Sequence, residues 1–146
     1  MVACSAVAAS MAIGASASDE LIKVGYAQVG HESDWRTANT QNYQDVFSEE
    51  NGYELSFVDC DNDNAAQIEA VRNFINQELD YIVIAPIQSA GWDTVLQEAQ
   101  DAGIPVIIAD REIEASEDLY DAWVGTNTTN EGITAGNWLA ENLDGK

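Results

Sequence analysis

Basic side chains are scarce in this sequence of 146 residues, which has five Lys and Arg against 26 Asp and Glu. The formal net charge of -21 at pH 7 repels phosphate backbones and anionic lipid, so no nucleic acid or membrane-surface partner is expected. The same charge disfavours anionic small molecules, and we expect a neutral ligand. Because cations are so few, the positions of two of them, Arg36 and Arg111, are informative.

Histidine and cysteine are almost absent. His31 is the single imidazole and no G-x-S-x-G segment occurs, which argues against a serine hydrolase. A zinc site needs several His or Cys ligands, and Cys4 and Cys60 are the only thiols. The segment from Gly25 to Ser33 has a superficial likeness to a phosphate-binding loop, but His31 stands where that loop needs lysine. No catalytic residue, metal ligand or cofactor is therefore predicted.

The first 18 residues contain no charged side chain, and Ala15-Ser16-Ala17 has the small-x-small form of a signal peptidase site. The basic residues that open a signal peptide are missing, so residues 1–18 are interpreted as a signal peptide remnant. The run is too short to make a good membrane span. We therefore expect the domain over residues 19–146 to lie outside the cytoplasm, in the periplasm or at the cell surface.

Cys4 offers a second interpretation of this segment. It follows a small residue, as a lipobox cysteine does, and would then anchor the protein to lipid. Ordinary cleavage is favoured, because the residues after Cys4 stay apolar instead of forming a polar tether. Cleavage after Ala17 would leave Cys60 as the only thiol, which excludes an internal disulfide.

Short apolar runs alternate with helical patterns along the rest of the chain, which is long enough for one domain with a core. Strands are predicted over residues 22–29, 53–58, 81–85, 105–109 and 122–125. Ser33 is expected to cap the first helix, Asn64 with Gln67 the second, and Thr128 with Glu131 the last. This alternation predicts an α/β fold, a doubly wound parallel sheet with right-handed crossovers.

Apolar and aromatic residues within the helices indicate how they pack. The last predicted helix carries apolar residues at helical spacing: Ile133, Gly136, Leu139, Ala140 and Leu143. Trp92 is interpreted as a core or cleft-rim residue, and Trp123 and Trp138 as structural.

Polar and aromatic side chains follow the first and fourth predicted strands. Trp35 and Arg36 come soon after the first, and Asp110 and Arg111 directly after the fourth. Ligands of open parallel sheets bind outside the carboxyl ends of the strands, where the strand order reverses. Trp35 is either a core residue of the next helix or an aromatic plate for a ligand ring. Asp110 and Arg111 form either a surface ion pair or a hydrogen-bonding pair for a polyhydroxylated ligand.

Several segments, taken in order, resemble the type I sugar-binding proteins of bacterial ABC importers. They are Val24-Gly25-Tyr26-Ala27-Gln28-Val29-Gly30-x-Glu32-Ser33-x-Trp35-Arg36, Gln67-Ile68-x-Ala70-Val71-Arg72-x-Phe74-Ile75, Ala85-Pro86, Gly91-Trp92, Ala102-Gly103-Ile104-Pro105-Val106 and Asp110-Arg111. Within that family the resemblance points to the group that binds galactofuranose, fructose and related monosaccharides. It covers nearly all of residues 21–146 and corresponds to the N-terminal lobe only, with the C-terminal lobe absent from this sequence.

The resemblance implies a flavodoxin-like sheet of order 2-1-3-4-5 and a receptor, not an enzyme, whose two lobes close on a monosaccharide. Its partners would be the sugar, in furanose or pyranose form, and the membrane subunits of an ABC permease, and the full-length protein is expected to be a monomer. Trp35 would stack on the apolar face of the sugar, while Arg36, Asp110 and Arg111 would hydrogen-bond its hydroxyls. Further candidate contacts are Glu32, Ser33 and Gln28.

Two other classes of protein remain open at this stage. The effector-sensing domain of a lac-repressor-type regulator shares the fold, but the export signal and the lack of a helix-turn-helix region argue against it. A small flavodoxin-like enzyme or phosphate binder would need a phosphate cradle or a catalytic base, and neither can be located in the sequence.

Overall fold

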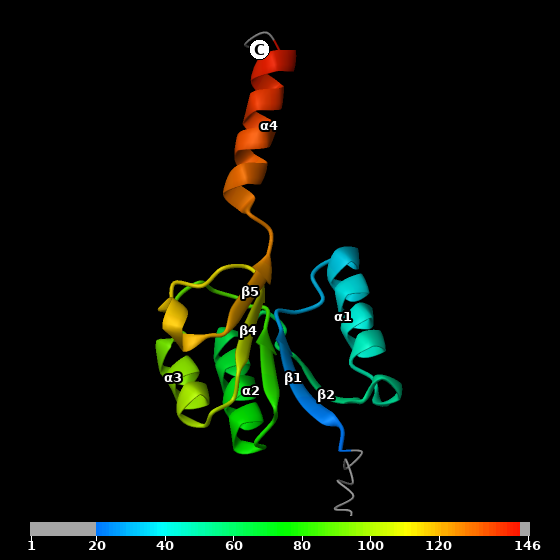
Figure 1. Ribbon diagram of the computed structural model, residues 1–146. Coiled ribbons are helices and arrows are strands. Elements are labelled where there is room, and N and C mark those ends of the chain that lie inside the picture. Colours follow the sequence, from blue (N-terminus) through cyan, green and yellow to red (C-terminus); the bar gives the residue numbers. More distant parts are fainter. Residues whose placement is uncertain (1–19, 144–146) are drawn as a thin grey trace, which may run out of the picture.

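The computed structural model describes residues 20–143, in which strands and helices alternate along the chain (Figure 1). The strands are β1 (Ile22–Gln28), β2 (Tyr53–Asp59), β3 (Tyr81–Ile84), β4 (Val106–Asp110) and β5 (Ala122–Gly125). The α-helices are α1 (Asp34–Val46), α2 (Asn64–Asn76), α3 (Asp93–Asp101) and α4 (Thr128–Asn142), with short 3-10 turns η1 (Glu49–Asn51) and η2 (Glu117–Leu119). The predicted signal peptide remnant, with Cys4, lies outside the described residues.

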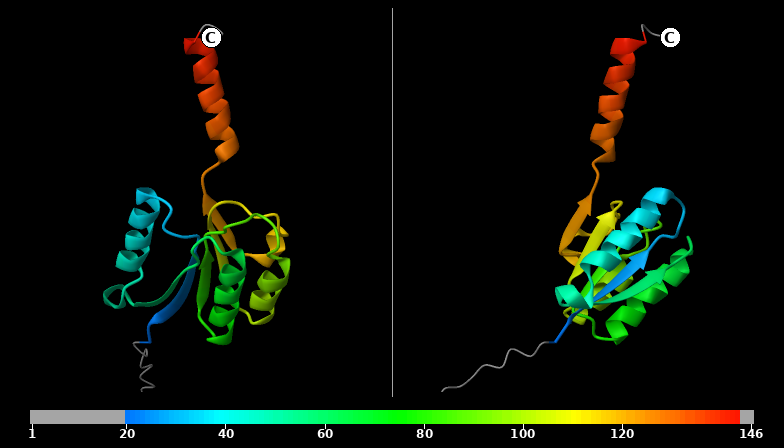
Figure 2. Two further views of the ribbon diagram at one scale, coloured as in Figure 1. Left: turned by 180° about the vertical axis from the view of Figure 1, so that it is seen from behind. Right: turned by 90° about the vertical axis from the view of Figure 1, so that its right-hand side faces the viewer.

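The five strands form one parallel sheet in the order β2-β1-β3-β4-β5, which confirms the predicted topology. Helix α1 lies on one face of the sheet, and α2 and α3 lie on the other, as the front and rear views show (Figure 2). The strand order reverses between β1 and β3. The carboxyl ends of these two strands and of β4 therefore mark the place where a ligand of this fold binds.

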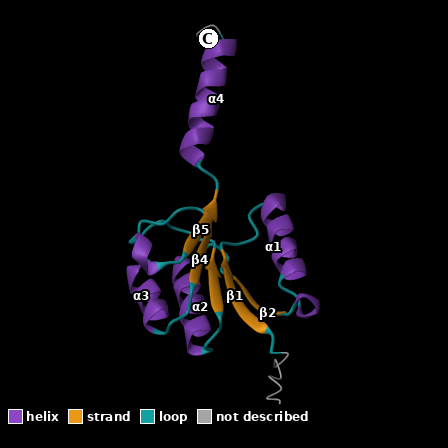
Figure 3. Ribbon diagram, viewed as in Figure 1, coloured by secondary structure: helices purple, strands orange, loops and turns teal. Residues whose placement is uncertain are grey.

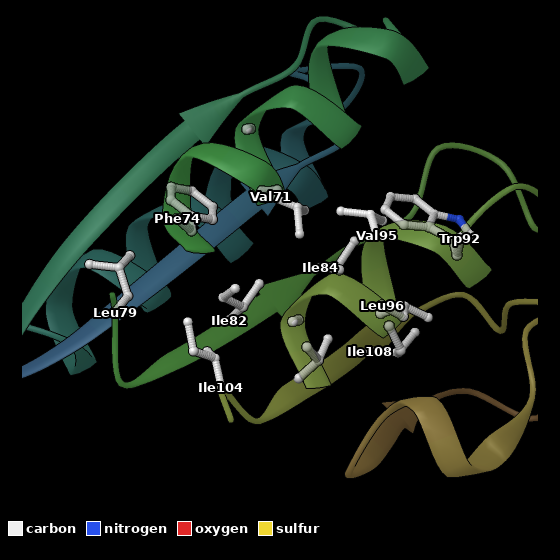
Figure 4. Close-up of a cluster of buried hydrophobic side chains, with 14 of the residues drawn as sticks. Val71, Phe74, Leu79, Ile82, Ile84, Trp92, Val95, Leu96, Ile104 and Ile108 are labelled. Atoms are coloured by element: carbon white, nitrogen blue, oxygen red, sulfur yellow. The ribbon is translucent and has the colours of Figure 1, made fainter. Parts of the chain in front are cut away.

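The larger core lies between the sheet and helices α2 and α3 (Figure 4). Its fully buried side chains come from both helices and from the central strands: Val71, Phe74, Val95, Leu96, Ile82, Ile84 and Ile108. Gly25 lets α2 approach β1, because a Cβ at this position would lie 2.6 Å from the Phe74 ring. Trp92 is fully buried and its indole N–H donates to the Gln88 carbonyl at 2.8 Å, so it is a core residue.

The face beneath α1 is covered mainly by aromatic rings. Tyr26 of β1 stacks on Tyr43 of α1 with 4.1 Å between ring centroids, and Phe47 extends the stack toward Tyr53. The Tyr26 hydroxyl donates to Asn39 Oδ1 at 3.0 Å. Burial is the main reason that the pKa of Tyr26 is raised, so this phenol stays protonated.

Two helix caps differ from the prediction by one residue. Asp63, not Asn64, caps α2, because its carboxylate accepts hydrogen bonds from the backbone N–H groups of Ala65 and Ala66. Asn127, not Thr128, caps α4 by accepting from the Asn130 N–H. In each helix the residue before the predicted cap already accepts the first-turn N–H groups, so the helix begins one residue earlier than expected.

Helix α4 extends from the end of β5 beyond the carboxyl edge of the sheet (Figure 3). None of its described residues is buried, and its apolar residue Leu139 and the following Leu143 remain exposed. The interpretation of Trp138 as structural is wrong for the described residues, since this side chain is 58% exposed. Trp123 does pack against the larger core. No described helix is long and apolar enough to cross a membrane.

Candidate ligand-binding site

Arg36 lies in the first turn of α1, where Ser33 caps the helix by accepting the Arg36 backbone N–H at 3.1 Å. Its side chain is only 2% exposed and lies between two carboxylates. Nε donates to Glu32 Oε1 at 3.1 Å, and Nη2 donates to Asp110 Oδ2 at 2.6 Å. The fold thus brings together three of the predicted site residues, although Arg36 and Asp110 are 74 positions apart in the sequence.

The electrostatics of this cluster keep Arg36 charged. Burial by itself lowers the pKa of the guanidinium, but the hydrogen bonds to Asp110 and then Glu32 outweigh it and raise the pKa above its ordinary value. The remaining terminal nitrogen, Nη1, is buried and has no hydrogen-bond partner among the described residues. Protein atoms enclose this nitrogen, so a ligand oxygen does not reach it in this arrangement of the side chains.

Asp110 owes its position to an unusual backbone at the end of β4. Its φ is +71°, in the left-handed region, and the Arg111 N–H closes a tight turn onto the Ala109 carbonyl at 3.0 Å. Gly125 of β5 is paired with Asp110, and a Cβ there would overlap the Asp110 carbonyl oxygen. Such strained turns cluster at binding sites, where they fix the direction of a side chain.

Trp35 and Arg111 are the exposed members of the candidate site. Trp35 is 60% exposed, and the Arg36 Cζ lies 4.8 Å from its ring centroid, a cation–π geometry. This exposure excludes the core interpretation of Trp35. The Arg111 side chain is exposed and makes no hydrogen bond or ion pair with any residue that the structure describes. A cavity of about 390 Å³ is lined by Ser89, Asp110, Arg111, Glu112, Ile113, Glu114, Thr126 and Thr128.

Gln28 lies beneath the site instead of in it. Its side chain is fully buried, its amide nitrogen donates to the Gly30 carbonyl at 3.2 Å, and its amide oxygen accepts the Thr40 hydroxyl at 2.6 Å. Thr40 lies one turn after Arg36 on α1, and its Oγ1 is also 3.0 Å from the Arg36 carbonyl. Gln28 therefore fastens α1 to the end of β1, and Ser33 acts as a helix cap.

Gln67 is a structural residue of the site, although its spacing from Asn64 predicts a role in a helix cap. It is fully buried on α2, and its amide nitrogen donates to the carbonyls of Ala27 and Ala85 at 3.1 and 2.7 Å. Its amide oxygen accepts the Ile87 N–H at 2.9 Å, so one side chain joins the ends of β1 and β3. Its place one and two turns before Val71 and Phe74, on the apolar face of α2, is the signal that could have revealed its burial.

Acidic, histidine and cysteine side chains do not gather into a metal site in the described part of the chain, where no three of them are suitably placed. The candidate site therefore offers hydrogen-bond donors, acceptors and one aromatic face. This set suits an uncharged ligand that carries several hydroxyl groups and an apolar face.

Comparison with known proteins agrees with this geometry. Residues 24–146 match the family described as periplasmic binding protein domain. The chain is 41% identical over 143 residues to the galactofuranose-binding protein YtfQ of Escherichia coli K12, covering 97% of this chain and 44% of that protein. It is 36% identical over 105 residues to the fructose import binding protein FruE of Bifidobacterium longum, covering 71% and 32%.

Solved structures give the same result. A crystal structure of a galactofuranose binding protein superposes with a TM-score of 0.80 at 41% identity, over 86% of this chain and 42% of that one. The periplasmic binding protein of the arabinose ABC transporter from Shewanella sp. ANA-3, bound to L-arabinofuranose, gives 0.78 at 39% identity, over 85% and 41%. The chain spans less than half the length of these relatives. On the match over residues 24–146 and these identities, the chain belongs to the periplasmic binding protein domain family.

Proposed function

We propose that this protein is an extracytoplasmic receptor that binds a neutral monosaccharide and passes it to the membrane subunits of an ABC importer. Its relatives support this, since two of them are described as galactofuranose-binding and fructose import binding proteins. In this proposal the protein is exported and is then either cleaved after Ala17 or lipidated at Cys4. It performs no chemical reaction on the sugar.

The observation that carries the proposal is the buried Arg36 guanidinium, which is bonded to Asp110 at the carboxyl edge of the sheet and lies beside the exposed indole of Trp35. Arg36 would donate to a sugar hydroxyl, and Trp35 would cover the apolar face of the ring. Arg111 and Asp110 would hold further hydroxyls from the side of the cavity. Hydrogen bonds to charged groups contribute about 1.5 to 3 kcal/mol each, enough for specific recognition by a small set of side chains.

We further propose that residues 19–146 act as one lobe of a two-lobed receptor. The relatives are more than twice as long as the part of them that this chain covers. A second lobe that closes over the carboxyl edge of the sheet would exclude water and supply the remaining hydrogen bonds, by hinge motion between the lobes.

The test is calorimetric titration of the protein expressed from its complete gene with fructose, galactose, ribose and arabinose. Tight binding of at least one sugar is expected. Trp35→Ala and Arg111→Ala should each weaken it by about tenfold or more, since a charged hydrogen bond or a stacked ring is lost. Arg72→Ala removes an exposed arginine of α2, on the face of the sheet away from α1, and should leave binding unchanged.

Two results would contradict the proposal. If the protein binds none of the sugars, the receptor function is wrong. If it binds a sugar equally well without Trp35 and Arg111, the receptor function stands but this placement of the site is wrong.

A further inference from the structure

We propose that Asn51 is a site of spontaneous deamidation that the fold protects, and that the reaction, once it has occurred, weakens the carboxyl end of helix α1. Asn51 and Gly52 lie in the exposed turn between α1 and β2, and Asn51 is the one asparagine of the sequence that precedes a glycine. Asparagine deamidates fastest before glycine, because glycine has no side chain to hinder ring closure. This inference does not depend on the proposed sugar-binding function.

The amide group of Asn51 holds the carboxyl end of α1. Its Nδ2 donates to the carbonyls of Asp45 and Val46 at 3.1 and 3.0 Å, and to Ser48 Oγ at 3.1 Å. The last carbonyls of a helix have no partner within the helix, and the last turn of α1 contains no basic residue. The Asn51 amide therefore satisfies two carbonyls at the negative end of the helix dipole.

The same turn requires a glycine at position 52. The φ angle of Gly52 is +88°, in the left-handed region, where a side chain would be strained. Its N–H donates to the Glu49 carbonyl at 3.0 Å, and its carbonyl accepts the Ile22 N–H at 3.0 Å, so the turn also holds the start of β1. The structure thus needs an amide at position 51 and a glycine at position 52, and this pair is the most reactive one for deamidation.

Deamidation begins when the backbone nitrogen of Gly52 loses its proton and attacks Cγ of Asn51. The new C–N bond closes a succinimide ring, and the side-chain nitrogen leaves as ammonia. Water then opens the ring at either carbonyl, which gives aspartate or isoaspartate, so water is consumed and ammonia is released in equal amounts. The hydrogen bonds of the Gly52 N–H and of the Asn51 amide oppose this attack, so the reaction proceeds from states in which the turn has opened.

Either product places a carboxylate against the carbonyls of Asp45 and Val46. A carboxylate cannot donate a hydrogen bond, and a negative charge is unfavourable at the carboxyl end of a helix. Glu49 and Glu50 add further negative charge in the same turn. The altered turn therefore cannot reform its hydrogen bonds, and the last turn of α1 opens more often after the reaction.

The first experiment measures deamidation of the protein expressed from its complete gene, kept at mildly alkaline pH with and without urea. Trypsin releases residues 37–72 as one peptide, since no Lys or Arg lies between Arg36 and Arg72, and tandem mass spectrometry locates the reacted asparagine in it. We expect Asn51 to react at least about tenfold more slowly in the folded protein than in urea, and Asn51→Gln to remove the signal. Equal rates in the two states overturn the protection, and faster reaction at another asparagine of this peptide in urea overturns the assignment of the site.

The second experiment measures hydrogen exchange of the backbone amides in the last turn of α1. Asn51→Asp should raise their exchange rate by about tenfold, because the bonds to two helix carbonyls are lost. Asn42→Asp is the matched control: it adds the same charge to α1 at an exposed residue whose side chain makes no hydrogen bond within the described part of the chain. This control should change exchange by less than about threefold. Equal increases in both variants, or no increase in Asn51→Asp, overturn the role of the amide, and the first experiment needs no altered protein to fold.

Discussion

A full positive charge on Arg36 lies where water scarcely reaches, and the two carboxylates beside it make that position tolerable. Burying an ion costs several kcal/mol, which only close, hydrogen-bonded partners offset. Asp110 and Glu32 are partly exposed, so they keep some hydration while they neutralise the guanidinium. At the scale of single residues, the site is thus built around the Arg36 cation, and the fold places two carboxylates within hydrogen-bond distance of it.

Replacing Arg36 should destabilise the fold much more than replacing an exposed arginine. Arg36→Ala removes the partner of both carboxylates and should lower the free energy of unfolding by about 2 kcal/mol, less than for a fully buried pair because the carboxylates reach water. Arg36→Lys should not restore it, since one ammonium cannot copy the planar fork. Urea denaturation measures the change. Arg72→Ala is the control, and equal losses in both variants would show that burial of Arg36 contributes nothing.

Cys60 should react slowly in the folded protein. Its side chain is 3% exposed, and burial, aided by the charges of Asp59 and Asp63, raises the pKa of its thiol from 9.0 to about 11. Because the thiolate is the reactive form, the pH profile of iodoacetamide alkylation should rise toward about 11 in the folded state and toward about 9 in urea. Peptide-level mass spectrometry follows Cys60 alone, and equally fast labelling in both states would contradict the burial.

The elements of the fold could be predicted because each follows from a local pattern. Alternating apolar runs and helical spacing predicted all five strands and a parallel sheet, and the family resemblance implied the strand order that the structure has. On α1 the helical spacing indicated Tyr43 and Phe47, which do pack against the sheet, but not Arg36 and Thr40, because buried polar residues do not stand out in an apolar pattern. Gln28 is likewise indistinguishable from a surface amide until the partners that bury it are known.

Part of the candidate site could be predicted for a different reason. Strand ends of a parallel sheet meet at one edge, and this rule alone brought Arg36 and Asp110 together across 74 positions. The bonding of Gln67 to Ala85 depends on how far α2 tilts onto the sheet, which no local pattern encodes. The sequence therefore predicted that Arg36 and Asp110 lie at the carboxyl edge of the sheet. It did not predict that Gln28 and Gln67 are buried beneath that edge.

At the scale of elements, Gln67 should control how β1 and β3 are joined at the site. Gln67→Leu fills the same space but leaves the carbonyls of Ala27 and Ala85 and the N–H of Ile87 buried without partners, so we expect a loss of about 3 kcal/mol in unfolding free energy. Gln97→Leu, on the exposed side of α3, should change stability by less than about 0.5 kcal/mol. If the two substitutions change the free energy of unfolding by similar amounts in urea denaturation, Gln67 does not join β1 and β3 in the way we propose.

At the scale of the whole molecule, the excess of carboxylates opposes the compact state. A formal charge of -21 on 146 residues repels itself, and compaction brings these charges closer together. Ion pairs offset little of this, because only a few cations are available; Arg36 and Arg72 are already paired in the described part of the chain. The folded state is therefore opposed by repulsion between carboxylates, and dissolved salt can screen this repulsion.

Added salt should accordingly stabilise this protein, opposite to what a fold held by surface ion pairs would show. Raising NaCl from about 0.02 M to about 0.5 M shortens the Debye length from about 20 Å to about 4 Å, which screens the long-range repulsion. The buried contact of Arg36 with Asp110 is screened much less, so the net effect at pH 7 is a rise in Tm of several degrees. At the sequence pI of about 4.1 the net charge is close to zero, so the same salt step should move Tm little there. A fall in Tm with salt at pH 7 would mean that attractive pairs outweigh the repulsion, whereas an equal rise at both pH values would assign the effect to ion-specific hydration.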